Sequence, residues 1–216
     1  MILAIDVSAS LDFGPAGATK QDLVREVAAV LAFASFRKND RVGLLLFSDS
    51  VELWLPPAKG ESARARIFRS LAEFVPASPR TALACVQNYL SRLLSRRAVV
   101  FLFSDFCTPD FARPLASLAA AHDLIPVRVL APGEAKLPAT GFTLLRDPET
   151  GEQLLWDSAD GPGRQAFQAR VAAWESEVQA AFRARKLDAI KLETGRDYLP
   201  ELVRFFDTRD AHYGTH

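Results

Sequence analysis

The stretch Ala98-Val99-Val100-Phe101-Leu102-Phe103-Ser104 decides the fold, because its apolar run shows no polar alternation. A strand that is apolar on both faces must be covered on both faces, as in the centre of a mainly parallel sheet. On either side of this strand, short apolar runs alternate with longer segments of helical period. We therefore predict an α/β fold, with a doubly wound sheet and helices on both of its faces.

Six strands are expected in the order 3-2-1-4-5-6, which right-handed crossovers favour. Only the turn Asp49-Ser50 separates the second strand from the third, so the third is predicted to be antiparallel and at an edge. Pro56-Pro57 is expected to end that edge strand. The six strands are predicted over residues 2–7, 42–47, 51–55, 98–104, 124–130 and 189–193.

One β-hairpin is predicted as an insertion at about 140–157, around the turn Pro148-Glu149-Thr150-Gly151. No Gly/Ser/Pro-rich linker divides the chain, so residues 1–210 are expected to form a single domain with a polar tail over 211–216. Helices are predicted over residues 20–37, 62–74, 81–95, 109–122, 162–186 and 198–209.

Charge and cysteine content exclude several classes of protein. The 216 residues include 26 Lys plus Arg and 26 Asp plus Glu, so no net positive field attracts nucleic acid or anionic lipid. Cys85 and Cys107 are too few for a disulfide framework, which fits a reducing compartment. No apolar run approaches the ~20 residues of a membrane-spanning helix, so no direct membrane insertion is expected. A cytoplasmic location is predicted, with membrane association only if natural sequence precedes Met1.

Oxygen-bearing side chains follow several strands of the predicted sheet. The first strand ends in Asp6-Val7-Ser8-Ala9-Ser10, Thr81 begins a predicted helix after the loop Ser78-Pro79-Arg80, and Asp105 follows the central strand. Ligands bind parallel sheets at the carboxyl ends of the strands, where these loops are expected to meet. Hydroxyl and carboxylate oxygens suit a hard cation, with Mg²⁺ as first candidate and Mn²⁺ or Ca²⁺ as alternatives. The plainer interpretation is an ordinary strand-to-helix loop.

This three-part pattern resembles the metal-ion-dependent adhesion site of von Willebrand factor type A domains. Its signature is Asp-x-Ser-x-Ser, a later Thr and an Asp that ends the fourth strand, and all five positions match. The resemblance implies that Ser8, Ser10 and Thr81 bind the metal directly, while Asp6 and Asp105 act mostly through water.

Further segments resemble the bacterial family called domain of unknown function 58. They are residues 39–44, 104–106, 137–141, 146–151 and 198–200 together with Phe205-Phe206. The resemblance covers essentially the whole chain. It implies work beside a MoxR-type AAA+ ATPase in protein assembly or in metal insertion into other proteins.

Three functions are weighed from these residues. Three neutral hydroxyl ligands would leave a bound ion most of its positive charge, which favours capture of a partner's carboxylate. We therefore expect a metal-dependent protein-interaction module and no enzymatic activity. The first alternative is a Mg²⁺-dependent phosphohydrolase that uses Asp6 as its nucleophile. The second is a structural α/β domain without a metal.

Overall fold

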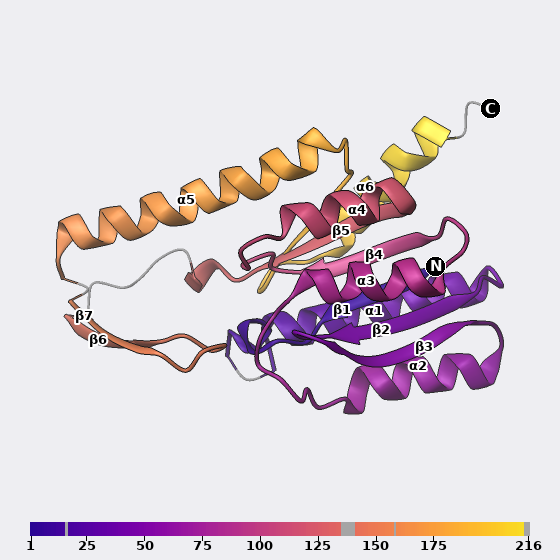
Figure 1. Cartoon of the computed structure of the whole chain (residues 1–216), viewed down its shortest axis with the longest axis horizontal. Helices are drawn as coiled ribbons and strands as arrows, with labels where there is room; N and C mark the ends of the chain where they lie inside the picture. The colour runs from indigo at the N-terminus through magenta and orange to yellow at the C-terminus, as the bar shows by residue number, and fades with distance from the viewer. Residues whose placement is uncertain (16, 135–140, 158, 214–216) are drawn as a thin grey trace.

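A six-stranded sheet lies at the centre of the computed structural model, which describes residues 1–15, 17–134, 141–157 and 159–213 (Figure 1). Its order is β3-β2-β1-β4-β5-β8, and neighbours pair in parallel except β2 with β3. The predicted order is thus confirmed, with β8 as the sixth strand. The strands of this sheet are β1 (Ile2–Asp6), β2 (Val42–Phe47), β3 (Val51–Ala58), β4 (Val99–Ser104), β5 (Asp123–Leu130) and β8 (Ile190–Glu193).

The central strand β1 is buried along its whole length. Ile2 and Ala4 pack into the core on one face of the sheet, and Leu3 and Ile5 pack into the core on the other. Apolar side chains are needed on both faces because helices cover both, which is why the strand lacks polar alternation.

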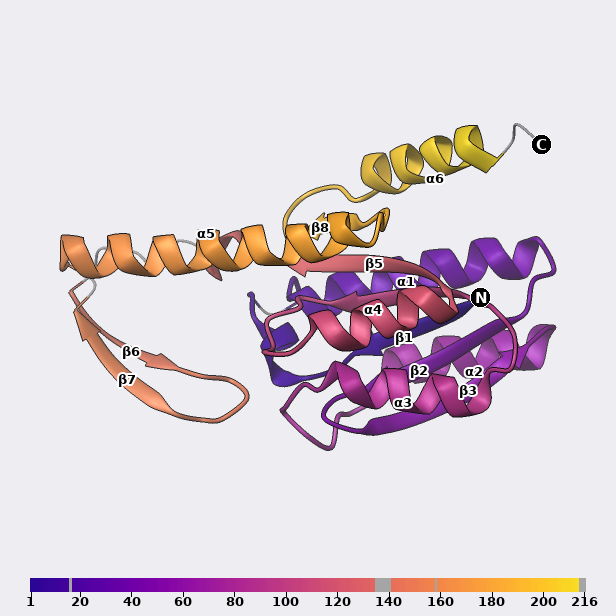
Figure 2. The same cartoon turned by 45° about the horizontal axis from the view of Figure 1, so that its top comes forward.

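Helices form one layer on each face of the sheet (Figure 2). One layer contains α1 (Lys20–Arg37), α2 (Glu61–Glu73) and α6 (Leu199–Tyr213), which contribute to the core around Leu3. The other layer contains α3 (Leu83–Leu93), α4 (Ala112–Ala121) and α5 (Gly161–Ala184). Two short 3₁₀ turns, η1 (Ala9–Asp12) and η2 (Pro132–Glu134), lie in loops that follow β1 and β5.

Several predicted boundaries are wrong, and among them α3 begins at Leu83 rather than at 81 and α4 at Ala112 rather than at 109. Strand β3 continues through Pro56-Pro57 to Ala58, because an edge strand has one side without partners and tolerates residues that lack an N–H. Helix α6 extends to Tyr213, beyond its predicted end at 209, and so continues into the first residues of the predicted tail. Residues 214–216 of that predicted tail lie outside the described part of the chain.

The inserted hairpin is made of β6 (Phe142–Arg146) and β7 (Gln153–Asp157), which pair antiparallel. It extends as an arm from the beginning of α5 back towards the loops near η1 (Figure 2). Its base contacts α5 through Trp156 and Phe167, whose ring centroids are 6.1 Å apart. Along its length the arm leaves four large apolar side chains exposed: Phe142, Leu144, Leu154 and Leu155. The prediction of about 140–157 describes this insertion, although residue 140 lies outside the described residues.

Helix α1 begins with a reciprocal capping box. The Thr19 hydroxyl accepts a hydrogen bond from the Asp22 N–H at 3.1 Å, and the Asp22 carboxylate accepts one from the Thr19 N–H at 3.0 Å. Such a cap satisfies two N–H groups that the helix itself leaves without partners. The cap also fixes the position of Lys20, the first residue of the helix.

We expect Thr19→Ala to lower the free energy of unfolding by about 1 to 2 kcal/mol, because the Asp22 N–H loses its acceptor. Urea unfolding followed by circular dichroism measures the change. Ser176→Ala is the matched control, since Ser176 is an exposed residue inside α5 whose hydroxyl bonds the Ala172 carbonyl. Equal stability of Thr19→Ala and the wild type would show that the capping box does not stabilise α1.

Candidate functional site

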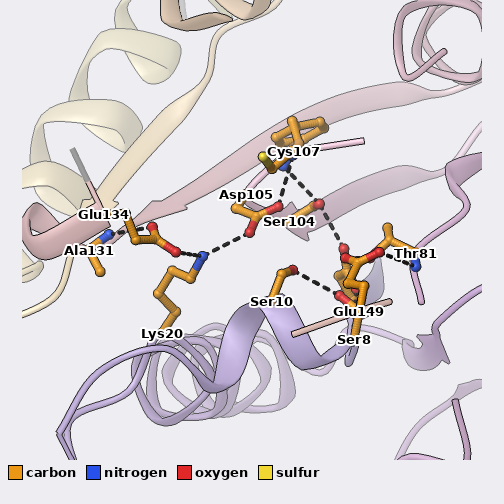
Figure 3. A network of polar contacts seen from close by, with 12 residues as sticks. Ser8, Ser10, Lys20, Thr81, Ser104, Asp105, Cys107, Ala131, Glu134 and Glu149 are labelled. Atoms are coloured by element: carbon orange, nitrogen blue, oxygen red, sulfur yellow. Dashed lines mark hydrogen bonds and ion pairs between the residues drawn. The ribbon is translucent and has the colours of Figure 1, made fainter. Parts of the chain in front are cut away.

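Four of the five predicted site residues, Ser8, Ser10, Thr81 and Asp105, gather at the carboxyl ends of β1 and β4 (Figure 3), and hydrogen bonds from Ser8 and Ser104 place Asp6 with them. Asp6 ends β1, and Asp105 directly follows β4, its parallel neighbour. The loop after β1 carries Ser8 and Ser10. Thr81 comes from the segment before α3, which is joined to the first loop by a hydrogen bond from Ala9 N to the Pro79 carbonyl at 2.9 Å. Adjacent parallel strands therefore bring residues from three distant parts of the chain to one place.

The Asp6 carboxylate is fully buried and accepts hydrogen bonds from neutral groups. Ser8 N–H donates to its Oδ1 at 3.0 Å, and the Ser104 hydroxyl donates to its Oδ2 at 2.8 Å. Burial raises the pKa of Asp6 to about 7, and repulsion by Asp105 adds to this shift, while the hydrogen bonds from Ser8 and Ser104 oppose it. A buried carboxylate that lies near a second carboxylate and is bonded by neutral groups stabilises a cation placed beside it.

The Asp105 carboxylate is held in place by backbone geometry and by a lysine. Phe106 adopts a positive φ of 56°, in the sparsely populated left-handed region, and Cys107 N–H donates to Asp105 Oδ1 at 2.9 Å. Lys20 Nζ donates to Asp105 Oδ2 at 2.8 Å and to Glu134 Oε1 at 2.6 Å. Burial lowers the pKa of the Lys20 ammonium, but Asp105 and Glu134 outweigh burial and hold this pKa above its ordinary value. Lys20 is therefore a fixed positive charge at the edge of the site.

Hydroxyl groups line the remaining part of the site. The Ser8 and Ser10 hydroxyl oxygens lie 3.1 Å apart. The Thr81 hydroxyl donates to Glu149 Oε1 at 2.9 Å, and the Thr81 N–H donates to Glu149 Oε2 at 3.1 Å. Glu149 belongs to the turn between β6 and β7, so the arm reaches the site with a carboxylate at its tip.

Four residues of the site were not predicted as such: Lys20, Ser104, Glu134 and Glu149. Lys20 stands in the first turn of a helix, where a lysine usually faces solvent, and Glu149 stands in a turn motif. One feature of the sequence pointed to a role for Glu149. It follows Asp147-Pro148 in the turn of the predicted hairpin, and that hairpin is an insertion in the alternation of strands and helices.

The two cysteines near the site have thiols with raised pKa values. Burial raises the pKa of Cys85 to about 12, with a further contribution from Asp6. Burial likewise raises the pKa of Cys107 to about 11, and Asp105 adds to that shift. Since the thiolate is the reactive form, neither residue is activated for redox chemistry.

The donor set fits a hard cation bound largely by hydroxyls. Within the described residues, no group of three or more His, Cys, Asp or Glu side chains is placed to hold a metal ion. The Ser8–Ser10 and Thr81–Glu149 oxygen pairs, at 3.1 and 2.9 Å, have the ordinary spacing of hydrogen-bonded oxygens. The chemistry of the hydroxyls, with the buried acids Asp6 and Asp105 behind them, is what suits an ion of the Mg²⁺ type.

Fold and site together define a doubly wound α/β protein with an oxygen-rich site at the ends of its central strands. The model of the protein family of unknown function DUF58 matches residues 1–177 of the chain. The chain belongs to this family, as the sequence resemblance predicted.

Relatives at the sequence level occur in mycobacteria. The protein Rv1480 of Mycobacterium tuberculosis is 33% identical over 210 residues, which are 96% of this chain and 66% of that relative. The chain thus spans just under two thirds of the length of this relative. A second protein, MAV169 of Mycobacterium avium, is 30% identical over 158 residues, which are 72% of this chain and 93% of that relative.

Solved structures show the same fold at low sequence identity. The protein BatB from Bacteroides thetaiotaomicron has a TM-score of 0.60 at 15% identity, covering 98% of this chain and 97% of that one. An aerotolerance-related membrane protein from Bacteroides fragilis has a TM-score of 0.56 at 16% identity, covering 94% of each chain. Among the described helices of the present chain, none combines the length and the apolar character that crossing a membrane requires.

Proposed function

We propose that the chain is a metal-dependent protein-interaction module that binds an acidic side chain of a partner. Ser8, Ser10 and Thr81 would hold the ion directly, and Asp6 and Asp105 would support it. The observation that carries the proposal is the convergence of these hydroxyls and two buried carboxylates at one end of the sheet. The resemblance of their pattern to the adhesion site of von Willebrand factor type A domains agrees with it.

The electrostatics of the site support binding of a cation. Two carboxylates, those of Asp105 and Glu134, bond the Lys20 ammonium, whereas the carboxylate of Asp6 is bonded by the neutral groups of Ser8 and Ser104 and that of Glu149 by Thr81. A divalent ion would reduce the repulsion among these carboxylates, particularly between Asp6 and Asp105. Its hydroxyl ligands carry no charge, so the ion would keep the ability to attract a carboxylate from outside.

We propose a binding function rather than an enzymatic one because of the surroundings of Asp6. A nucleophilic aspartate must reach its substrate. Asp6 is 0% exposed, and each of its carboxylate oxygens accepts a hydrogen bond, from Ser8 N–H and from the Ser104 hydroxyl. These contacts oppose the phosphohydrolase alternative. A MoxR-type AAA+ ATPase, or a client protein of such an ATPase, is the first partner to test, as the family resemblance suggests.

Substitution of Ser10 by alanine tests the metal site. Ser10 is half-buried, and its side chain contacts Ser8 at the site, so its removal should spare the core. Isothermal titration with Mn²⁺ and with Mg²⁺ should show affinity lowered about 10- to 100-fold, because one direct ligand is lost. Ser91→Ala on α3 is the control, since the Ser91 hydroxyl is exposed and bonds the Asn88 carbonyl.

The same variants test the partner. Capture of a MoxR-type ATPase by the immobilised wild-type chain should require Mg²⁺, should be lost in chelator, and should be weakened by Ser10→Ala but not by Ser91→Ala. Capture that is indifferent to metal would refute the adhesion mechanism. Absence of metal binding by the wild type would favour the structural domain without a metal, and hydrolysis of a phosphoester that Asp6→Ala abolishes would favour the enzyme.

A further inference from the structure

We infer that Glu149 is an internal ligand of the site, and that the hairpin arm places it where the carboxylate of a partner would bind. This inference rests on the proposed function, because it concerns the same ion. It adds Glu149, from a fourth segment of the chain, to the proposed metal ligands. It also implies that Glu149 and a partner's carboxylate compete for the same position on the ion.

The contact between Glu149 and Thr81 is bidentate. One Glu149 oxygen accepts from the Thr81 hydroxyl at 2.9 Å, and the other accepts from the Thr81 N–H at 3.1 Å. Thr81 is the threonine of the predicted metal site, so the carboxylate lies against a proposed direct ligand. Figure 3 shows Glu149 against Thr81, on the side of the site opposite Lys20 and Glu134.

The turn itself presents this carboxylate. Asp147 Oδ1 accepts hydrogen bonds from the N–H groups of Glu149 at 2.8 Å and of Thr150 at 3.0 Å. Gly151 follows with a positive φ of 75°, and its N–H donates to the Asp147 carbonyl at 2.9 Å. The backbone of the tip is therefore ordered without the Glu149 carboxylate, which bonds Thr81 instead.

We expect the arm to separate readily from the site. A two-stranded hairpin is only marginally stable by itself, and the exposed apolar residues of the arm receive little cover from the rest of the chain. Its base is anchored on α5 through Trp156 and Phe167, while its tip is held at Thr81 by polar contacts. An external carboxylate could thus replace Glu149 without any disruption of the main sheet.

Charge-neutral substitution tests the inference. Glu149→Gln keeps the size of the side chain, and Glu152→Gln is the matched control because Glu152 is an exposed acid of the same hairpin. Isothermal titration should show Mn²⁺ affinity about 10- to 100-fold weaker for Glu149→Gln and unchanged for Glu152→Gln. With Mn²⁺ saturating, acetate should bind about tenfold more tightly to Glu149→Gln, because the tethered competitor no longer carries its charge.

A second readout locates the arm directly. Bound Mn²⁺ should broaden the amide resonances of Thr150 and Gly151 in the NMR spectrum of the wild type, and much less in that of Glu149→Ala. If the wild type binds Mn²⁺ and Glu149→Gln matches it in both Mn²⁺ and acetate affinity, the inference is wrong and the proposed function stands. If the wild type binds no Mn²⁺, both are wrong.

Discussion

Replacement of Lys20 by methionine should lower the free energy of unfolding in chelator by about 3 to 5 kcal/mol, the usual effect of removing one partner from a buried ion pair. The Lys20 side chain is 1% exposed, and its ammonium bonds Asp105 at 2.8 Å and Glu134 at 2.6 Å. Methionine fills similar space but leaves the Asp105 carboxylate buried beside Asp6 without a compensating charge. The loss should therefore arise from electrostatics rather than from a cavity.

Urea unfolding with and without Mg²⁺ tests whether Lys20 balances the negative charge of Asp105 at the site. In Mg²⁺ the deficit of Lys20→Met should shrink, because the ion supplies positive charge next to Asp105. Lys191→Met is the control, since Lys191 is 56% exposed and 3.9 Å from Glu175, a geometry worth no more than about 1 kcal/mol. Wild-type stability of Lys20→Met in chelator would contradict the assignment of Lys20 as the balancing charge.

Replacement of Asp6 by asparagine should abolish the stabilisation that Mg²⁺ gives to the fold. For the wild type we expect this gain to be about 2.7 kcal/mol at a free Mg²⁺ concentration 100 times the dissociation constant. Asparagine preserves the shape of the side chain but removes the buried negative charge that supports the ion. In chelator, the change in stability should stay below about 1 kcal/mol, because relief of repulsion from Asp105 offsets the altered bond with Ser104.

Thermal and urea unfolding across a series of Mg²⁺ concentrations measures this effect. Asp207→Asn, at an exposed position on α6, is the control and should retain the full dependence on Mg²⁺. An Asp6→Asn protein that still gains stability from Mg²⁺ like the wild type would show that the ion binds elsewhere.

The main sheet was predictable because its signals are local. Each central strand is a short run of apolar residues, and each carries its own evidence of burial, as Val99-Val100-Phe101-Leu102-Phe103 does. Right-handed crossovers then fix the order of the strands. The positions of Asp6 and Asp105 followed from that order, since both stand at the carboxyl ends of strands that pair in parallel.

The partners of the site residues could not be predicted in the same way. Lys20 and Asp105 are 85 residues apart, and Thr81 and Glu149 are 68 apart. No periodicity in the sequence links a lysine in the first turn of a helix to an acid that follows a strand. The burial of Lys20 could therefore not be predicted from the hydrophobic pattern. The end of β3 was mispredicted for a different reason: proline interrupts a central strand but not an edge strand, and that distinction depends on tertiary context.

From the pairing of β1 with β4 we also expect the site to form late in folding. Ser104 bonds Asp6 across 98 residues of chain, and parallel pairs of such separation form late because closure of the intervening loop costs entropy. On a ribosome that adds about 5 to 20 residues per second, the first three strands emerge several seconds before Asp105 does. An unfinished chain therefore lacks one side of the site, and we expect a partner that recognises the site to associate only with molecules whose folding is complete.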